Sequence, residues 1–158
     1  MYKYSDKNEN NDISLHDCRA NHIELNGKIL SFIFNDGIYI GENNKQNPYR
    51  KLSYTDKAEV RFDLTYKNPD DNITIYVFTE EDEKTIREKI EPHELIDKIN
   101  SGMELEFLNC YNGCGSVLFE CWLWFKEEPY HKECVLIISA DEITYYWNHM
   151  YEECTDTW

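Results

Sequence analysis

HIELNGKILSFIF, residues 22–34, is the segment that decides the fold. In its first half, apolar Ile23 and Leu25 alternate with polar side chains, which is typical of a strand with one buried face. Asn26 and Gly27 then form a tight-turn signal. Residues 29–34, which follow the turn, have apolar side chains on both faces, and this favours a central strand. The segment therefore predicts a β-hairpin.

Similar signals recur along the chain. Alternation over residues 58–79 predicts a second hairpin, while the tail from residue 140 permits strand or helix and favours strand because it is rich in Thr, Tyr and Trp. Residues 91–102 predict a short helix with an apolar stripe and a terminal glycine. Further strands are expected at residues 38–40, 103–107, 116–125 and 133–139.

These elements indicate a mainly β protein. We expect an antiparallel sandwich or half-open barrel of seven or eight strands, with one short helix closing one end. An α+β sheet with helices on one face is the alternative. No linker divides the chain, so residues 1–158 are predicted to form a single domain, with residues 1–12 frayed. The conformation of residues 80–90 stays open.

The composition indicates a globular chain. Of its 158 residues, 41% are hydrophobic and 30% are charged, which suffices for a core beneath a polar surface. No segment approaches the roughly 18 apolar residues of a membrane span, and the start lacks the layout of a secretion signal. We therefore expect a cytoplasmic protein whose six cysteines are reduced thiols.

The net charge of −15 is unevenly distributed. Up to Thr79 the chain has ten basic and twelve acidic residues, whereas from Glu80 onward it has six and nineteen. Such a field repels phosphate backbones and anionic lipids, so nucleic-acid and membrane binding are not expected. A basic protein is the favoured partner, and the alternative is an acidic surface that only keeps the protein soluble.

Residues 104–124 contain the predicted binding residues. Glu104 and Glu106 share one strand face, which is either a wet sheet surface or an acidic patch for a cationic partner. Trp122 and Trp124 share a face with Glu120, and exposed tryptophans on a sheet are typical of sugar stacking or of a protein interface. Core packing of both tryptophans is the favoured interpretation; if the face is open, aromatics ringed by acids would anchor a basic protein.

A second candidate is the polar cluster of His16, Asp17 and Arg19. In an extended chain, neighbouring side chains point to opposite faces, so His16 and Asp17 are not expected to bond each other. We interpret the cluster as structural, with Asp17 capping a turn and His16 bonding the backbone. The chain has no serine elbow, phosphate loop or two-histidine zinc helix, so no catalytic residue or cofactor is predicted.

Cys110 and Cys114 are followed, one strand later, by His131 and Cys134. Zinc requires four converging nitrogen or sulfur ligands, and this set would provide them if the two turns met at one end of a hairpin. The spacing is irregular for a zinc site. Free thiols are therefore the favoured interpretation, and no metal is predicted.

Leu15-His16-Asp17, together with the hairpin after it and Asp36-Gly37, resembles the N-terminal pattern of small immunity proteins from bacterial polymorphic toxin systems. The resemblance covers about 23 residues. It implies a cytoplasmic protein that binds and neutralises a cognate toxin, and it supplies no catalytic residues.

Two functions follow as hypotheses. The first is a non-enzymatic, immunity-like protein whose acidic second half attracts a basic toxin. The second is a small enzyme or ligand-binding β domain, with a pocket near His16, Asp17 and Arg19 or a sugar platform at Trp122 and Trp124. The identity of the partner and the oligomeric state are not encoded in any recognisable pattern.

Overall fold

The structure is a computed structural model that describes residues 1–152. Within them the chain forms fourteen strands, one α-helix and one 3-10 helix. In chain order the elements are β1 (Tyr4–Asp6), β2 (Ile13–Ser14), β3 (Cys18–Ala20), β4 (His22–Asn26), β5 (Ile29–Phe34), β6 (Tyr39–Ile40), β7 (Ser53–Thr55), β8 (Ala58–Leu64), η1 (Pro69–Asp71), β9 (Ile73–Glu81), β10 (Lys84–Ile90), α1 (Pro92–Asn100), β11 (Glu104–Gly113), β12 (Ser116–Trp124), β13 (His131–Trp147) and β14 (Met150–Glu152).

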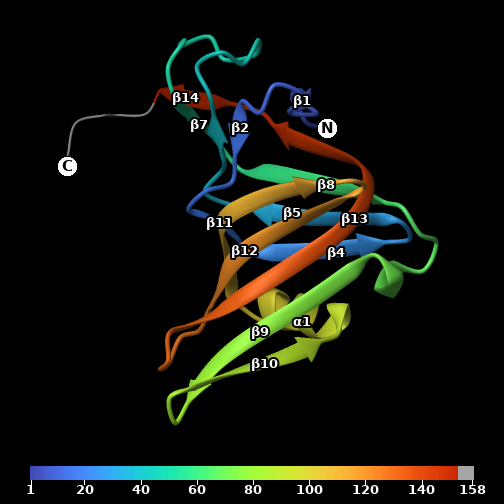
Figure 1. Ribbon diagram of the computed structural model, residues 1–158. Coiled ribbons are helices and arrows are strands. Elements are labelled where there is room, and N and C mark those ends of the chain that lie inside the picture. The colour runs from blue at the N-terminus through green and yellow to red at the C-terminus, as the bar shows by residue number, and fades with distance from the viewer. Residues whose placement is uncertain (153–158) are drawn as a thin grey trace.

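The strands form two sheets. The larger has ten strands, with the path β3-β11-β12-β13-β8-β5-β4 and with β1, β9 and β10 attached, while the smaller has the order β14-β7-β6-β2. In Figure 1, β9, β13 and β12 cross in front of β8, β5 and β4, so the larger sheet forms two layers and does not close into a barrel. The prediction of a mainly β, antiparallel fold with one short helix is confirmed.

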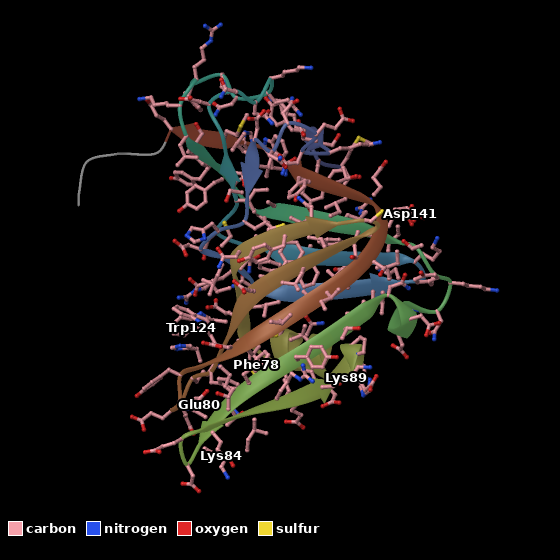
Figure 2. All side chains as sticks on the ribbon, viewed as in Figure 1. Phe78, Glu80, Lys84, Lys89, Trp124 and Asp141 are labelled. Carbon is pink, nitrogen blue, oxygen red and sulfur yellow. The ribbon has the colours of Figure 1, made fainter. Side chains whose placement is uncertain are left out.

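β13 connects the two layers. One edge of this strand pairs with β12 and then with β1, and the other pairs with β9 and then with β8. The register with β8 shifts between Ala140 and Glu142, which leaves Asp141 as a bulge at the bend of the strand (Figure 2). Because a bulge increases local twist, one strand can run through both layers.

The core lies between the layers and is built from the faces that the alternation predicts. Phe107 of β11 is at its centre, since its ring lies 5.0 Å from that of Phe119 and 5.5 Å from those of Phe32 and Phe34. Edge-to-face packing of this kind is favourable for aromatic rings. The other buried side chains from the predicted strands include Ile23, Leu30, Val60, Phe62, Leu64, Ile73, Ile75, Val77, Leu105, Leu123 and Leu136.

The predicted helix is α1. Pro92 occupies its first turn, and the Glu94 carboxylate accepts a hydrogen bond of 3.2 Å from the Glu91 N–H. Leu95 and Ile99 are buried, and they close the gap between β4 and β9. With nine residues, α1 is far shorter than the ~20 needed to cross a bilayer, and no longer helix occurs in residues 1–152.

The N-terminus differs from the prediction of a frayed segment. Tyr4–Asp6 pair with Tyr145–Trp147 of β13, and the Tyr4 ring stacks on the buried Trp147 ring at 5.8 Å. The Asn8 side chain makes hydrogen bonds to both the N–H and the C=O of Ile13. A three-residue strand is too short to show periodicity, so only the partner strand reveals it.

Residues 80–90, which the sequence left open, belong to the β9–β10 hairpin. Asp82 and Glu83 form its turn with φ angles of 48° and 62°. Two consecutive residues with positive φ are typical of a type I′ turn, which follows the twist of the strands. Eight strands have five or more residues, as many as were predicted, and the six shorter ones account for the larger total.

The centre of the core provides a stability test. We expect Phe107→Ala to lower the free energy of unfolding by about 3–5 kcal/mol, because it leaves a cavity among three phenylalanine rings. Urea denaturation measures the change. Phe78→Ala, the same substitution on the half-buried outer face, is the matched control and should cost less than half as much. Equal losses would show that Phe107 is not central.

Candidate functional site

The outward face of β11, β12 and β13 brings together most of the predicted binding residues. In the strand register Glu106, Trp122 and Glu133 lie in one row, and Glu104, Trp124 and His131 lie in the next. Arg19 of the edge strand β3 lies opposite Glu106. We call these seven residues the tryptophan face. Its Trp124 end points toward the lower left in Figure 2.

Arg19 contacts three other residues of this face. Its Nε lies 3.2 Å from Glu106 Oε2, its Nη1 lies 3.2 Å from Glu104 Oε2, and its guanidinium lies 4.4 Å from the centre of the Trp124 ring. The Trp124 indole N–H donates to Glu106 Oε2, and Asn21 Nδ2 donates to Glu104 Oε1 over 2.8 Å. The sequence groups Arg19 with His16 and Asp17. Only the pairing of β3 with β11 shows that Arg19 lies on the tryptophan face.

Glu104, Glu106 and Glu120 do not present the open acidic patch considered from the sequence, whereas Glu133 of the tryptophan face is exposed. The Glu106 side chain is only 10% exposed and is held by Arg19 and Trp124, while Glu104 shares the same arginine. Glu120 accepts hydrogen bonds from Asn109 at 2.8 Å and from Tyr111 at 3.3 Å. All three carboxylates therefore help to hold their neighbours in position.

Trp122 and Trp124 are half-buried, so they are neither sealed in the core nor fully exposed. Their rings lie 5.9 Å apart at 78°, and the His131 ring contacts them at 4.5 Å and 5.0 Å respectively. Near-perpendicular rings, one of them covered by Arg19, differ from the flat surface on which a sugar ring stacks. This geometry instead forms a small aromatic knob on the sheet.

Exposed acidic side chains lie at the end of this face. Because β9 and β13 pair in antiparallel fashion through Val77 and Cys134, the β9–β10 turn and the β12–β13 loop reach the same end of the molecule, at the lower left of Figure 1. Residues 80–83 are all acidic, and Glu127 and Glu128 lie in the loop. All are exposed. Lys84 and Lys126 lie beside these acids, so the end of the sheet nearest Trp124 is acidic on balance.

The predicted polar cluster divides in two. Asp17 has a φ of 61° and lies in a turn closed by a 2.9 Å hydrogen bond from the Cys18 N–H to the Leu15 C=O. In this left-handed conformation its carboxylate lies 3.5 Å from His16 Nε2, so the two side chains approach each other and do not point to opposite faces as predicted. That argument assumed an extended chain. His16 Nδ1 bonds the Leu108 carbonyl, which confirms its predicted contact with the backbone.

The members of that cluster do not share a pocket. His16 lines a cavity of about 350 Å³ together with Cys110 and Tyr145, whereas Asp17 and Arg19 line a separate groove of about 570 Å³. The pocket expected from all three residues is therefore absent from the described part of the chain. Arg19 belongs both to the groove and to the tryptophan face.

The four residues considered for zinc do not converge. Cys110 pairs with Phe119 of β12, and Cys114 lies in the turn before Ser116. His131 pairs with Trp124, which is about 17 Å along the strand from Phe119 and farther from Ser116. Cys134 is buried in the core. No group of three or more metal-ligating side chains occurs in residues 1–152, and the five cysteines there are all free thiols.

The other aromatic residues noted in the sequence have structural roles. Tyr145 and Trp147 are buried, and Tyr146 lies under the Arg61 guanidinium at 4.7 Å. Arg61 in turn bonds the buried carboxylate of Glu59 at 2.9 Å. An arginine between a buried glutamate and an aromatic ring thus occurs on both outer faces of the larger sheet. Trp158 lies outside the described residues.

Sequence reasoning missed two groups of surface aromatic residues. Phe78 is half-buried on the outward side of β9, beside the tryptophan face. The sequence pattern placed it only in the second strand of the hairpin over residues 58–79. Tyr39, Tyr54 and Tyr151 lie in one row across the smaller sheet. Strands of two or three residues leave no alternation, so the sequence contained no signal for this row.

No protein-family model, curated protein or solved structure matches this chain. The immunity-protein resemblance therefore rests on its N-terminal residues alone, and the function has to be argued from the chemistry of the surface.

Removing Arg19 tests how the tryptophan face is held. We expect Arg19→Met to lower the free energy of unfolding by about 1–3 kcal/mol, because it leaves the Glu106 carboxylate buried without its cation. The double variant Arg19→Met/Glu106→Gln should cost less than the sum of the single variants. Lys7→Met is the control, since its ion pair with Glu142 is exposed and solvent screening leaves it little effect on stability. Additive losses in thermal unfolding would contradict the coupling.

Thiol labelling tests the burial of the cysteines. Burial raises the pKa of Cys18 and of Cys134 from 9.0 to about 12 and raises that of Cys121 well above 9.0. At pH 8 a pKa of 12 leaves about a thousandfold less thiolate than a pKa of 9.

In a Cys154→Ser variant, which removes the cysteine outside the described residues, we expect a disulfide reagent to modify the two exposed thiols, Cys110 and Cys114. Cys110 should react more slowly, because desolvation raises its pKa. In urea all five should react. A third fast thiol in the native protein would contradict the core packing.

Proposed function

We propose that this chain is a non-enzymatic binding protein that captures a basic protein, as an immunity protein captures its toxin. The observation that supports it is the aromatic knob of Trp122, Trp124 and His131 beside exposed acidic side chains at the end of the sheet. Tryptophan and arginine are the side chains most enriched in the energetic centres of protein interfaces.

The rigidity of the tryptophan face favours binding. Trp122 and Trp124 lie on a strand paired on both edges, and Arg19 holds the Trp124 ring from above. A side chain that is already ordered loses less conformational entropy on association. The face therefore suits a partner that docks without remodelling it.

The charge distribution favours a basic partner. Residues 80–133 hold fourteen acidic and six basic side chains. The acids of the β9–β10 turn and the β12–β13 loop are exposed, so they act at a distance and accelerate encounter with a cation. The same field disfavours nucleic acids and anionic membranes. A basic toxin in the cytoplasm, such as a nuclease, fits this chemistry.

A ligand- or carbohydrate-binding domain is the second candidate. The cavity of about 350 Å³ that His16, Cys110 and Tyr145 line is its supporting observation. The perpendicular tryptophan rings do not favour a sugar platform. Binding of a small ligand at this cavity, with no protein partner, would favour the second candidate over the first.

The decisive experiment measures association with the product of the gene beside this one on its chromosome. Under the proposal the two proteins form a complex, and this chain neutralises the toxicity of the other. Raising the salt from about 50 to 500 mM should slow association at least tenfold, because the encounter is electrostatic. Trp122→Ala should speed dissociation at least tenfold, as expected for a central interface tryptophan.

Charge reversal separates steering from contact. Because Glu104 and Glu106 are bound to Arg19, the test uses Glu81→Lys/Glu83→Lys at the exposed β9–β10 hairpin, which should slow association about tenfold and leave dissociation unchanged. Asp70→Lys/Asp71→Lys makes the same charge change in η1 and should have a smaller effect. Absence of a complex, or equal slowing by both pairs, would contradict the proposal.

A further inference from the structure

The smaller sheet presents a row of tyrosines to solvent. Ser14, Tyr39, Tyr54 and Tyr151 lie opposite one another on β2, β6, β7 and β14. Tyr54 is 39% exposed and Tyr151 is 46% exposed, and their rings lie 5.4 Å apart. Tyrosine offers a large contact area at low conformational cost, which is why it is common in binding surfaces.

Beside this row lies the groove of about 570 Å³ that separates the smaller sheet from β3. Tyr39 and Tyr54 form one side of it. Acidic groups and Arg19 come from the other elements around it. Its main lining side chains are Asp17, Arg19, Asp36, Tyr39, Tyr54 and Glu104.

The groove is negative because its one cation is already engaged. Arg19 bonds Glu104 and Glu106 and lies over Trp124, so its charge is directed away from the aspartates. The Asp36 carboxylate forms no hydrogen bond or ion pair with any residue in 1–152, and it is exposed. Within residues 1–152 the Asp17 carboxylate makes one such contact, with the exposed His16 at 3.5 Å.

The backbone beside Asp36 is held firmly. Gly37 has a φ of 85°, and a Cβ there would lie 2.1 Å from the Thr55 carbonyl oxygen, so β7 packs directly against this turn. The Gly37 N–H also donates to the Phe34 C=O over 3.2 Å. The backbone of Asp36 is therefore held at the groove, beside the tyrosines.

From these contacts we infer that the groove seats a cationic side chain, arginine or lysine, of the basic protein partner. Carboxylates at Asp17 and Asp36 match its charge, and the tyrosine rings accept a cation over their faces. Arg19 and Glu104 belong to both the groove and the tryptophan face, so the two surfaces are continuous and one partner can cover both. The inference rests on the proposed function for the identity of the partner.

A small probe tests the groove without that partner. N-acetyl-arginine amide is titrated into the ¹⁵N-labelled full-length chain, and the amide shifts are followed by NMR. We expect the largest shifts at residues 17–19, 36–39 and 54, with saturation in the millimolar range. N-acetyl-citrulline amide has a similar shape without the charge and should cause no comparable shifts.

Two variants define the contacts. Asp36→Asn should weaken binding of the arginine probe about fivefold, as expected for the loss of one ion pair of about 1 kcal/mol. Asp70→Asn removes the same charge from an exposed turn outside the groove and is the matched control. Tyr54→Leu keeps an apolar side chain without the aromatic face and should weaken binding two- to fivefold.

Several results would overturn the inference. These are equal shifts with citrulline, equal losses in Asp36→Asn and Asp70→Asn, shifts confined to the acidic β9–β10 turn, or no groove shifts at millimolar probe. If the neighbouring gene product binds and Trp122→Ala weakens it while Asp36→Asn does not, the groove fails and the proposed function stands. If no protein binds but the arginine probe occupies the groove, the proposed function fails instead.

Discussion

The pairing of β13 on both edges is the constraint on which the rest of the structure depends. A single strand of seventeen residues satisfies its backbone hydrogen bonds first with β12 and β9, then with β8 and β1. Because a buried backbone needs these partners, the strand cannot leave the sheet, and the bulge at Asp141 lets it turn from one layer into the other. The core between the layers and the outward direction of Trp122 and Trp124 both follow from this path.

The same side-chain arrangement, an arginine between a carboxylate and an aromatic ring, occurs on both outer faces of the larger sheet. On one face Arg19 lies between the Glu106 carboxylate and the Trp124 ring, and on the other Arg61 lies between Glu59 and Tyr146. A carboxylate with so little exposure needs a cation and hydrogen bonds, and the arginine supplies both while its flat face covers an aromatic ring. Only the first of these clusters adjoins an acidic groove and an acidic sheet end, which is why it is the better candidate for binding.

The acidic side chains fall into two classes with different consequences. Glu104, Glu106 and Glu120, beside the tryptophans, are bound by neighbouring donors and organise the surface. Those of the β9–β10 turn and the β12–β13 loop are exposed, and Asp36 in the groove is unpaired within residues 1–152. Exposed charges accelerate encounter, whereas a fixed carboxylate beside aromatic rings selects what docks. Net charge alone does not distinguish these roles, because it counts a neutralised glutamate and a free one equally.

The sequence by itself determined most of the long strands, their buried faces, the helix and the antiparallel class, because alternation, turn residues and capping act over a few neighbouring positions. It left β10 open and did not show that residues 131–147 form one continuous strand. It also identified Trp122 and Trp124 as a shared face. Tertiary structure decided what surrounds them. Arg19 reaches Glu106 across 87 positions, and the tyrosine row forms from strands too short for a pattern. Asp17 meets His16 only because its backbone turns left-handed. Contacts between distant segments depend on the register of the strands, and local periodicity does not specify that register.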